Sequence, residues 1–477
     1  MNAPWSLDIP ASLMEQLHTH LFPGDGDEHG AVIVAGVAET PRGIRLLARE
    51  LVRARDGVDY VPGQRGYRML TASFVTDQIL RCAAQGLVYL AVHCHSGGEA
   101  VDFSADDLAS HERGYPALLD IAYGRPVGGL VVASNAVAGD VWLPGGGRVR
   151  LSRTRVVGRP LQTLYPEPPT RSVADGTYDR QARLFGDRGQ AILGAQKVGV
   201  IGVGGAGSLI VEYLARLGVG HLVVVDSDRI ELTNLPRLVG STRRDARSWL
   251  TAPGRPEPLR RLGERLSARK TRIAARVVRQ ASRSTTVECV DGDLAVDAVA
   301  RRFVDCDHLF LAADSMRARL AFNALVHQYL IPGAQVGAKV TVNTETGSVD
   351  DVFCVNRPVL PDSGCLWCNG LISPARLQEE ALTETERHEQ RYVEEAAVRA
   401  PSVITLNAVA VAHAVDDYLF SVTGLLRPGT SNRYRRFLPR EADFALDEPR
   451  KDPSCPECGS CPNGRLALGD ARRLPTR

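Results

Sequence analysis

The chain has 477 residues, of which 44% are hydrophobic and 23% are charged, and its formal net charge is +2. These values are typical of a globular protein with about three domains, and the near-neutral charge favours neither a nucleic-acid partner nor an anionic membrane surface. No apolar run reaches the ~18 residues of a membrane span, and residues 1–10 lack the order of a secretory signal. We therefore expect a cytoplasmic protein that binds neither nucleic acid nor membrane.

The first 155 residues are predicted to form one α/β unit. Apolar residues recur there with helical spacing in some stretches and in short continuous runs in others. The pattern predicts helices over 10–22, 70–84 and 106–122, and strands over 31–37, 87–93, 127–133 and 141–143.

A candidate metal site lies at the end of the strand predicted over 87–93. The strand ends in His93-Cys94-His95, and Ser104-Ala105-Asp106-Asp107 follows. Residues two apart on a strand point to the same side, so His93 and His95 can converge on one metal ion. A carboxylate from the next helix would complete three protein ligands and leave the open position that catalytic zinc requires.

This pattern resembles the JAMM (also called JAB or MPN+) metalloprotease motif, H-x-H followed by S-x-x-D, over about residues 8–155. The resemblance implies a fused zinc peptidase. Its zinc ligands would be His93, His95 and Asp107. Glu28 would be the base, and Ser104 would stabilise the oxyanion.

Two departures from the JAMM motif leave alternatives open. Ser96 stands where the family has proline, and the gap before Ser104 is one residue longer than usual. Asp106 fits the usual gap length, whereas Asp107 fits the S-x-x-D spacing, and we choose Asp107. A degenerate domain without catalytic activity is the alternative to a working peptidase.

A proline-rich stretch over 156–176 is predicted to be a linker, and a second α/β domain is predicted over 177–425. Strand-like 197–203, helix-like 206–217 and strand-like 221–225 alternate at its start. Such alternation predicts a Rossmann-like, doubly wound parallel sheet.

A glycine-rich loop links the first of these strands to its helix. The loop contains Gly202, Gly204, Gly205 and Gly207, and Asp226 ends the next strand. Glycines at this point let the backbone approach a phosphate, and the helix N-terminus offers unpaired N–H groups to the anion. The string also satisfies G-x-G-x-x-G, so by itself it does not separate ATP from a dinucleotide.

Three further segments resemble the ThiF/MoeB/ubiquitin-activating superfamily over roughly residues 175–425. They are 226–237 (DSDRIELTNLPR), 178–181 (YDRQ) and the apolar strand that ends in Asp314, 309–314 (LFLAAD). The nicotinamide-dependent oxidoreductase reading is disfavoured, because a hydride transferase has no use for the set Asn234, Arg237 and Asp314.

The resemblance implies roles for individual residues. Asp226 would hold the ribose, and Asp228 belongs to the same cofactor-binding set. The triphosphate would be surrounded by Asn234, Arg237 and Lys270, although an apparent insertion over 242–265 precedes Lys270. Asp314 would bind Mg²⁺. Arg180 would reach the γ-phosphate of the ATP held by a partner subunit, which implies a homodimer.

The implied activity is ATP- and Mg²⁺-dependent adenylation of the C-terminal glycine of a small ubiquitin-like or sulfur-carrier-like protein. A fused peptidase would process or deconjugate the same protein, and a conjugating-enzyme-like protein would be a further partner. Two alternatives remain. One is sulfur-carrier activation in cofactor biosynthesis, and the other is adenylation of a non-protein substrate with the N-terminal domain as a recruitment module.

Ten cysteines are present, and five of them fall into C-x-x-C spacings. Two thiolate pairs favour structural zinc, and the predicted ligands are Cys365, Cys368, Cys455 and Cys458. Cys461 adds a further C-x-x-C, so either it or a neighbouring cysteine is spare. The tail over 426–477 is expected to complete this cluster but to be loosely structured. Residues 369–401 contain no cysteine, although 392–401 resembles the end of the family's crossover segment. We therefore expect the reaction to stop at the acyl-adenylate.

Overall fold

The computed structural model describes residues 3–63, 66, 68–169, 175–343, 346–381 and 401–477. The chain divides into two units. The first consists of residues 1–171, 327–330 and 453–473, and the second of residues 172–326, 331–452 and 474–477. The crossover segment over 392–401 lies outside the described residues except for Pro401. Among the described residues, no helix combines the length and apolar character that crossing a membrane requires.

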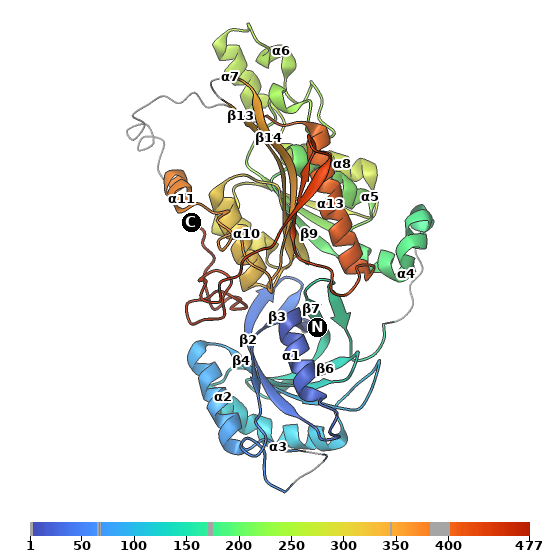
Figure 1. The fold of residues 1–477 in the computed structure, drawn as a ribbon, viewed down its shortest axis with the longest axis vertical. Coiled ribbons are helices and arrows are strands. Elements are labelled where there is room, and N and C mark those ends of the chain that lie inside the picture. The colour runs from blue at the N-terminus through green and yellow to red at the C-terminus, as the bar shows by residue number, and fades with distance from the viewer. Residues whose placement is uncertain (1–2, 64–65, 67, 170–174, 344–345, 382–400) are drawn as a thin grey trace. The chain divides into compact units, whose positions relative to one another are not determined.

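The first unit is built around one sheet that closes on itself (Figure 1). Its strands are β1 (Trp5–Pro10), β2 (Gly30–Thr40), β3 (Gly43–Arg53), β4 (Val88–Cys94), β5 (Val127–Val132), β6 (Val137–Leu143), β7 (Gly147–Val157) and β8 (Gln162–Leu164). They follow the order β1-β3-β2-β4-β5-β6-β7-β8, and β1 also pairs with β7. Strand β8 falls within 156–176, the range predicted to be a linker.

Three helices cover the two faces of this sheet: α1 (Ala11–Leu21), α2 (Ala72–Gln85) and α3 (Ala105–Ile121). Leu17 and Leu21 of α1 pack into a core on one face. Phe74 of α2 and Tyr115 of α3 belong to a separate core on the other. The end of β4 and the start of α3, which carry the histidine and aspartate motif, are thereby held on a rigid scaffold.

A buried ion triad fixes β1 between its two neighbours. Asp8 is fully buried, and its carboxylate accepts hydrogen bonds from Arg155 (2.7 Å) on β7 and from Arg45 on β3. Burial alone raises the pKa of this carboxyl group, but the two guanidinium groups outweigh that effect and hold it well below its usual range. Since all three groups are buried, loss of the Asp8 carboxylate removes an ion-pair partner from two buried guanidinium groups at once.

The second unit contains a larger mixed sheet. Its strands are β9 (Lys197–Ile201), β10 (His221–Asp226), β11 (Thr286–Asp291), β12 (His308–Leu311), β13 (Gly333–Val342), β14 (Val349–Val359), β15 (Tyr434–Leu438) and β16 (Asp443–Asp447). The order is β11-β10-β9-β12-β13-β14-β15-β16, parallel as far as β13 and antiparallel beyond it.

The chain moves from β9 to β10 on one side and later returns to β12 on the other. The carboxyl ends of β9 and β12 therefore flank a topological switch point, where open α/β sheets bind ligands.

Helices lie on both faces of this sheet. They are α4 (Asp179–Ala195), α5 (Gly205–Arg216), α6 (Ser248–Thr251), α7 (Glu257–Leu266), α8 (Lys270–Ala281), α9 (Asp297–Ala300), α10 (Met316–Gln328), α11 (Pro374–Ala381) and α13 (Ile404–Thr423). Figure 1 shows α5, α8 and α13 on one face and α10 on the other. The predicted α/β fold with a doubly wound parallel sheet is confirmed for this unit.

Most predicted elements are present, and the missed ones have physical reasons. The helices predicted over 10–22, 70–84 and 106–122 correspond to α1, α2 and α3. Strands β1, β3 and β7 were not predicted, because Arg, Asp and Glu interrupt their apolar patterns. The expectation of a loosely structured tail is wrong for β15 and β16, which extend the sheet through β14.

Candidate functional site

The glycine-rich loop joins β9 to α5 at the switch point. Gly202 has φ +86°, and a Cβ there would lie 2.9 Å from the backbone nitrogen of Ala313. A Cβ on Gly207 would lie 1.8 Å from the carbonyl oxygen of Gly202. By contrast, a Cβ on Gly204 would have no neighbour within 4 Å. The loop is therefore tight against β12 but open beside Gly204, where the helix N-terminus can accept an anion.

Asp226 ties the glycine-rich loop to the turn after β10. Its Oδ2 accepts the backbone N–H of Val203 (2.8 Å), and its Oδ1 accepts that of Asp228 (2.9 Å). Burial raises the pKa of the Asp226 carboxyl group, and the charge of Lys270, 3.6 Å away, opposes that rise. The carboxylate is thus fixed at the end of β10, where a ribose hydroxyl group can reach it.

Lys270 begins α8 and contacts the turn that follows β10. Its Nζ lies 2.7 Å from Asp228 Oδ2, and its backbone N–H donates to the carbonyl oxygen of Asp228 (3.2 Å). Only 12% of the Lys270 side chain is exposed. The inserted residues 242–265 therefore leave Lys270 beside Asp226 and Asp228.

Asn234 ends a short 3-10 turn (Leu232–Asn234), and Arg237 lies in the turn that follows it. Asn234 Oδ1 accepts the backbone N–H of Glu231 (3.1 Å), which locks the turn. The Arg237 guanidinium group donates to the carbonyl oxygen of Thr233 (3.1 Å). A Cβ on Gly205 would lie 3.4 Å from Arg237 Cδ, so the arginine lies against the glycine-rich loop.

Asp314 lies three residues beyond the end of β12 and is exposed. It directly follows Ala312 and Ala313, the residues that Gly202 approaches, so its backbone lies next to the glycine-rich loop. Arg180 occupies the first turn of α4, also exposed, and α4 is kinked at Gly186 (φ 74°). The expected role of Arg180, contact with the γ-phosphate of ATP in a partner subunit, stays a prediction.

Two residues near this site were missed by sequence reasoning. Asn407 of α13 is buried, and a Cβ on Gly205 would lie 2.5 Å from its Nδ2. Glu380 of α11 accepts the backbone N–H groups of Met316 (2.8 Å) and Arg317 (3.0 Å) at the start of α10, just after Asp314. Both come from segments far along the chain from the motifs, and no local spacing marks them.

A second group of polar side chains lies in the first unit. His93 of β4, His95 just after β4 and Asp107 of α3 form a possible metal-ligand set whose ligand atoms all lie within 4.8 Å of one another. Asp107 Oδ2 is 3.4 Å from His93 Nε2 and 3.2 Å from His95 Nε2. His93 Nε2 is buried without a hydrogen-bond partner. An orphaned ring nitrogen facing a carboxylate fits a metal ion.

The surroundings of this group orient it. His95 Nδ1 lies 3.2 Å from the carbonyl oxygen of Asp102, a contact of the kind that leaves Nε2 free for a metal. Ser104 caps α3, and its hydroxyl group donates to Asp107 Oδ2 (2.7 Å). Burial alone raises the pKa of Asp107, but its interactions with His93 and Ser104 outweigh this and hold the carboxyl group well below its usual range. Asp106, the alternative ligand, is exposed.

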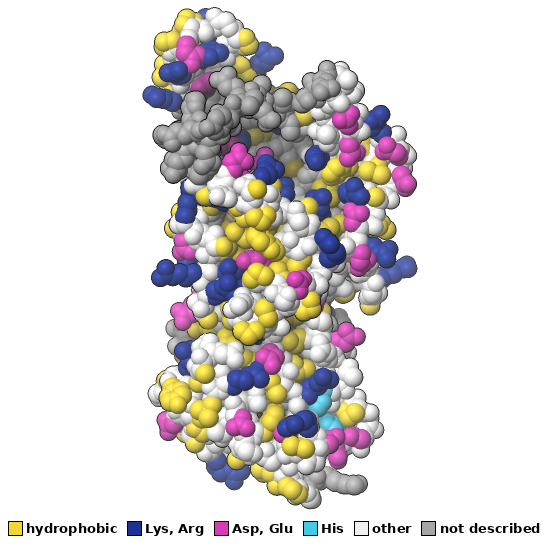
Figure 2. Space-filling view, turned by 60° about the vertical axis from the view of Figure 1, so that its left-hand side comes forward, with side chains coloured by type: hydrophobic (Ala, Val, Ile, Leu, Met, Phe, Trp, Pro, Cys, Tyr) yellow, Lys and Arg dark blue, Asp and Glu magenta, His cyan; other side chains and the backbone are white. Residues whose placement is uncertain are grey.

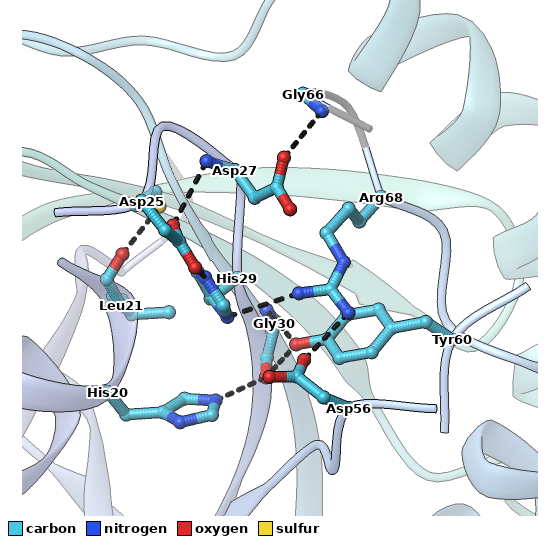
Figure 3. A network of polar contacts seen from close by, with 11 residues as sticks. His20, Leu21, Asp25, Asp27, His29, Gly30, Asp56, Tyr60, Gly66 and Arg68 are labelled. Carbon is cyan, nitrogen blue, oxygen red and sulfur yellow. Dashed lines mark hydrogen bonds and ion pairs between the residues drawn. The ribbon is translucent and has the colours of Figure 1, made fainter. Parts of the chain in front are cut away.

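Glu28 lies just before β2, in a segment held by the polar network of Figure 3. Its backbone N–H donates to the carbonyl oxygen of Gly66 (2.7 Å). The next residue, His29, is buried, and its Nε2 lies 2.9 Å from Asp25 Oδ2. Its Nδ1 lies 3.4 Å from Arg68, which stacks over the Tyr60 ring. The network fixes the backbone around Glu28, and no sequence motif predicted it.

The four predicted cysteine ligands form a further group, with sulfur atoms within 4.8 Å of one another: Cys365, Cys368, Cys455 and Cys458. Cys365 Sγ accepts the backbone N–H of Cys368 (3.4 Å), and Cys455 Sγ accepts that of Glu457 (3.4 Å). Backbone N–H groups pointing at sulfur stabilise thiolates, which are the form that binds zinc. Cys461 lies outside this group.

Comparison with known proteins adds to this geometry. The model of the ThiF family matches residues 178–459, which is more than half of the chain. The chain belongs to the ThiF family. The match covers the glycine-rich loop, the Asp226–Arg237 segment, Lys270 and Asp314, and it extends through Cys458.

Individual ThiF-type relatives match shorter segments. The tRNA threonylcarbamoyladenosine dehydratase of Escherichia coli (strain K12) is 27% identical over 157 residues, which are 33% of this chain and 51% of that protein. The sulfur carrier protein ThiS adenylyltransferase of Bacillus subtilis (strain 168) is 29% identical over 212 residues, 43% of this chain and 57% of that protein. The chain thus spans little more than half the length of these relatives.

Among solved structures, a crystal structure of E. coli MccB with MccA-N7isoASN has 18% sequence identity to this chain and a TM-score of 0.46. The alignment covers 61% of this chain and 76% of that one.

Proposed function

We propose that the second unit adenylates the C-terminal carboxylate of a small ubiquitin-like or sulfur-carrier-like protein with ATP. The observation that carries this proposal is the convergence of the glycine-rich loop, Asp226 and Lys270 at one end of the sheet. The loop is open beside Gly204, and Asp226 and Lys270 are paired at the adjoining strand end.

In the proposed reaction, an oxygen of the protein carboxylate attacks the α-phosphate of ATP. A new bond joins carboxylate oxygen to phosphorus, the bond to the β-phosphate oxygen breaks, and pyrophosphate leaves. Two anions must meet, so cationic groups that lie ready beside the phosphates lower the barrier. Arg237 and Lys270 are the cationic side chains that the structure offers at the glycine-rich loop and the Asp226 turn.

Asp226 is proposed to bind the ribose, with Asp228 orienting Lys270 and Asn234 holding the turn that carries Arg237. Asp314 is proposed to hold Mg²⁺, which supplies neutralisation of the triphosphate when bound. Its exposed carboxylate next to the glycine-rich loop is suited to a hard cation. Arg180 is proposed to act in the site of a second subunit of a homodimer.

The relatives support a protein substrate. One is named as a sulfur carrier protein ThiS adenylyltransferase, and another, from Haloferax volcanii, as a SAMP-activating enzyme E1 that is 50% identical over 54 residues. The relative named as a tRNA threonylcarbamoyladenosine dehydratase favours the alternative, a non-protein substrate. The test is ATP–pyrophosphate exchange with a panel of small proteins ending in glycine, each paired with a version lacking that glycine. Exchange that needs the glycine supports the proposal, and exchange indifferent to it contradicts it.

We also propose that the first unit is a JAMM-like zinc peptidase acting on the same small protein. The three-ligand group His93, His95 and Asp107, with its orphaned nitrogen, supports this. Zinc, when bound, supplies Lewis-acid activation of water. Glu28 is proposed as the base and Ser104 as the oxyanion-stabilising residue, although the Ser104 hydroxyl group already donates to Asp107. A conjugating-enzyme-like partner would consume the adenylate.

Cleavage of a carrier with residues added after its glycine tests the peptidase. His93→Ala should abolish trimming and leave pyrophosphate exchange unchanged. Trimming that survives in this variant refutes the assignment. The four cysteines are proposed to hold a structural zinc ion.

A further inference from the structure

An arginine-lined cavity of about 400 Å³ lies in the second unit, beside the turn after β10. Its lining includes Arg229, Arg244, Arg247, Arg269, Arg272 and Arg276. Asp245 is the only acidic residue among the described residues that line it. Two of the six arginines, Arg244 and Arg247, belong to the inserted segment 242–265.

The single carboxylate of the lining is already neutralised. Asp245 receives two hydrogen bonds from the Arg276 guanidinium group, at 3.0 and 2.7 Å. It also accepts the backbone N–H and the hydroxyl group of Thr242. The other five guanidinium groups therefore face the cavity without a carboxylate in its wall to balance them.

Backbone carbonyl groups hold three of these arginines in place. Arg229 donates to the carbonyl oxygen of Ser267 (2.6 Å), and Arg247 donates to that of Leu266 (3.1 Å). Arg269 donates to the carbonyl oxygen of Ser227 (2.6 Å). A carbonyl group orients a guanidinium group but leaves its charge uncancelled. Arg269 also lies 3.9 Å from the carboxylate of Asp291, which is outside the cavity lining and offsets part of the charge of that one arginine. Within the described part of the chain, the side chains of Arg244 and Arg272 make no hydrogen bond or ion pair.

Such a concentration of charge is not a general property of this protein. The formal net charge is only +2, and Figure 2 shows Lys and Arg side chains interspersed with Asp and Glu over the visible face. Like charges gathered in a concave wall repel one another and focus a positive potential into the cavity. A bound anion relieves this repulsion, and the planar fork of each guanidinium group matches phosphate oxygens in pairs.

We propose that this cavity binds a compact anion carrying several phosphate groups. Its volume of about 400 Å³ is in the range of small-molecule pockets, and the excess of cations calls for more than one negative charge. The cavity is distinct from the proposed ATP site, because Asp226, Asn234, Arg237, Lys270 and Asp314 do not line it. The two sites share a structural element, since Arg269 holds the carbonyl oxygen of Ser227, next to Asp226 and Asp228.

Titration calorimetry with inorganic tripolyphosphate, without Mg²⁺ or nucleotide, tests the proposal on the full chain. Arg244→Gln and Arg272→Gln alter exposed residues, so both variants should fold. Each should weaken binding roughly tenfold or more, as expected for a hydrogen bond to a charged group. Arg243→Gln is the matched control, because Arg243 is exposed and adjacent but does not line the cavity. It should weaken binding less than about twofold, within the range of surface substitutions.

A second control separates this site from the ATP site. Arg237→Gln should leave the cavity's binding event unchanged. The proposal is overturned by equal losses in the Arg243 and Arg244 variants, by loss confined to the Arg237 variant, or by absence of saturable binding. Binding of single-stranded RNA that depends on Arg244 and Arg272, with no binding of tripolyphosphate, would also overturn it.

Discussion

Lys270 and Lys197 offer a matched pair for testing which end of the second sheet binds nucleotide. Both lysines are almost equally buried, with 12% and 13% of their side chains exposed. Lys270 pairs with Asp228 at 2.7 Å, beyond the carboxyl end of β10, and Lys197 pairs with Asp305 at 2.6 Å, at the amino end of β9. Replacing each by methionine removes the same charge and keeps most of the side-chain volume.

The two substitutions should rank in opposite order for stability and for ATP binding. Asp305 is buried, with 4% of its side chain exposed, so Lys197→Met leaves a carboxylate in a poorly solvated place and should cost about 3 kcal/mol. Asp228 is 62% exposed, so water can replace Lys270 there, and the more buried Asp226, 3.6 Å from Lys270, keeps two backbone N–H donors. Lys270→Met should therefore cost less, about 1–2 kcal/mol. A lost hydrogen bond to a charged phosphate group corresponds to about 1.5–3 kcal/mol, or a weakening of ATP binding of roughly 10- to 100-fold.

Urea denaturation measures the first effect, and titration with ATP under conditions where both variants are folded measures the second. Lys197→Met should bind ATP like the unaltered chain, despite its larger loss of stability. The reasoning is refuted if Lys270→Met keeps normal ATP affinity, or if both variants lose affinity to the same extent.

Three other predictions concern metal, pH and folding. Asp107→Asn should lower the zinc content by one ion per chain without unfolding the protein, whereas Asp106→Asn, at an exposed position, should leave the zinc content unchanged. Mass spectrometry of metals measures this, and loss of zinc only in the Asp106 variant would reverse the assignment. Burial lowers the pKa of His308 from 6.5 to about 3, so the stability that depends on neutral His308 is present above pH 6.5. It is lost as the pH falls towards 3, by about 1.4 kcal/mol per pH unit. His308→Phe should flatten this part of the pH profile of unfolding, and an unchanged profile would contradict the assignment to His308. Asp8→Ala removes the carboxylate that pairs with the buried Arg45 and Arg155 and should destabilise the first unit by about 3–5 kcal/mol. Denaturant unfolding measures this, and a cost below about 1 kcal/mol would contradict the triad.

Parts of the candidate site could be predicted from the sequence because they depend on local rules. In a parallel sheet, residues that follow neighbouring strands meet at the same edge, so the glycine-rich loop after β9 and Asp226 after β10 had to be close. Residues two apart in extended chain share a face, which predicted His93, near the end of β4, beside His95, just after it. Lys270 could be located despite the insertion, because it begins the helix that precedes β11.

Other features depend on contacts between distant segments and left no local signal. Asn407 approaches Gly205 from α13, and Glu380 caps α10 from α11. The tail joins the first unit largely through backbone groups, as where the N–H of Gly469 donates to the carbonyl oxygen of Gln328 (3.0 Å). Backbone contacts of this kind put little constraint on side-chain identity, so composition alone predicted a loose tail. The arginines around the cavity come from separate segments of the chain, and no sequence motif marks them as a group.

The account depends most on the joining of a carrier carboxylate to AMP in the second unit. Intact-mass spectrometry can follow this directly, with ATP, Mg²⁺ and a small protein ending in glycine that stimulates pyrophosphate exchange. The account predicts a carrier bearing one AMP group with the unaltered chain and none with Asp314→Ala. Normal formation of that adduct by the Asp314 variant, with normal release of pyrophosphate, would contradict it.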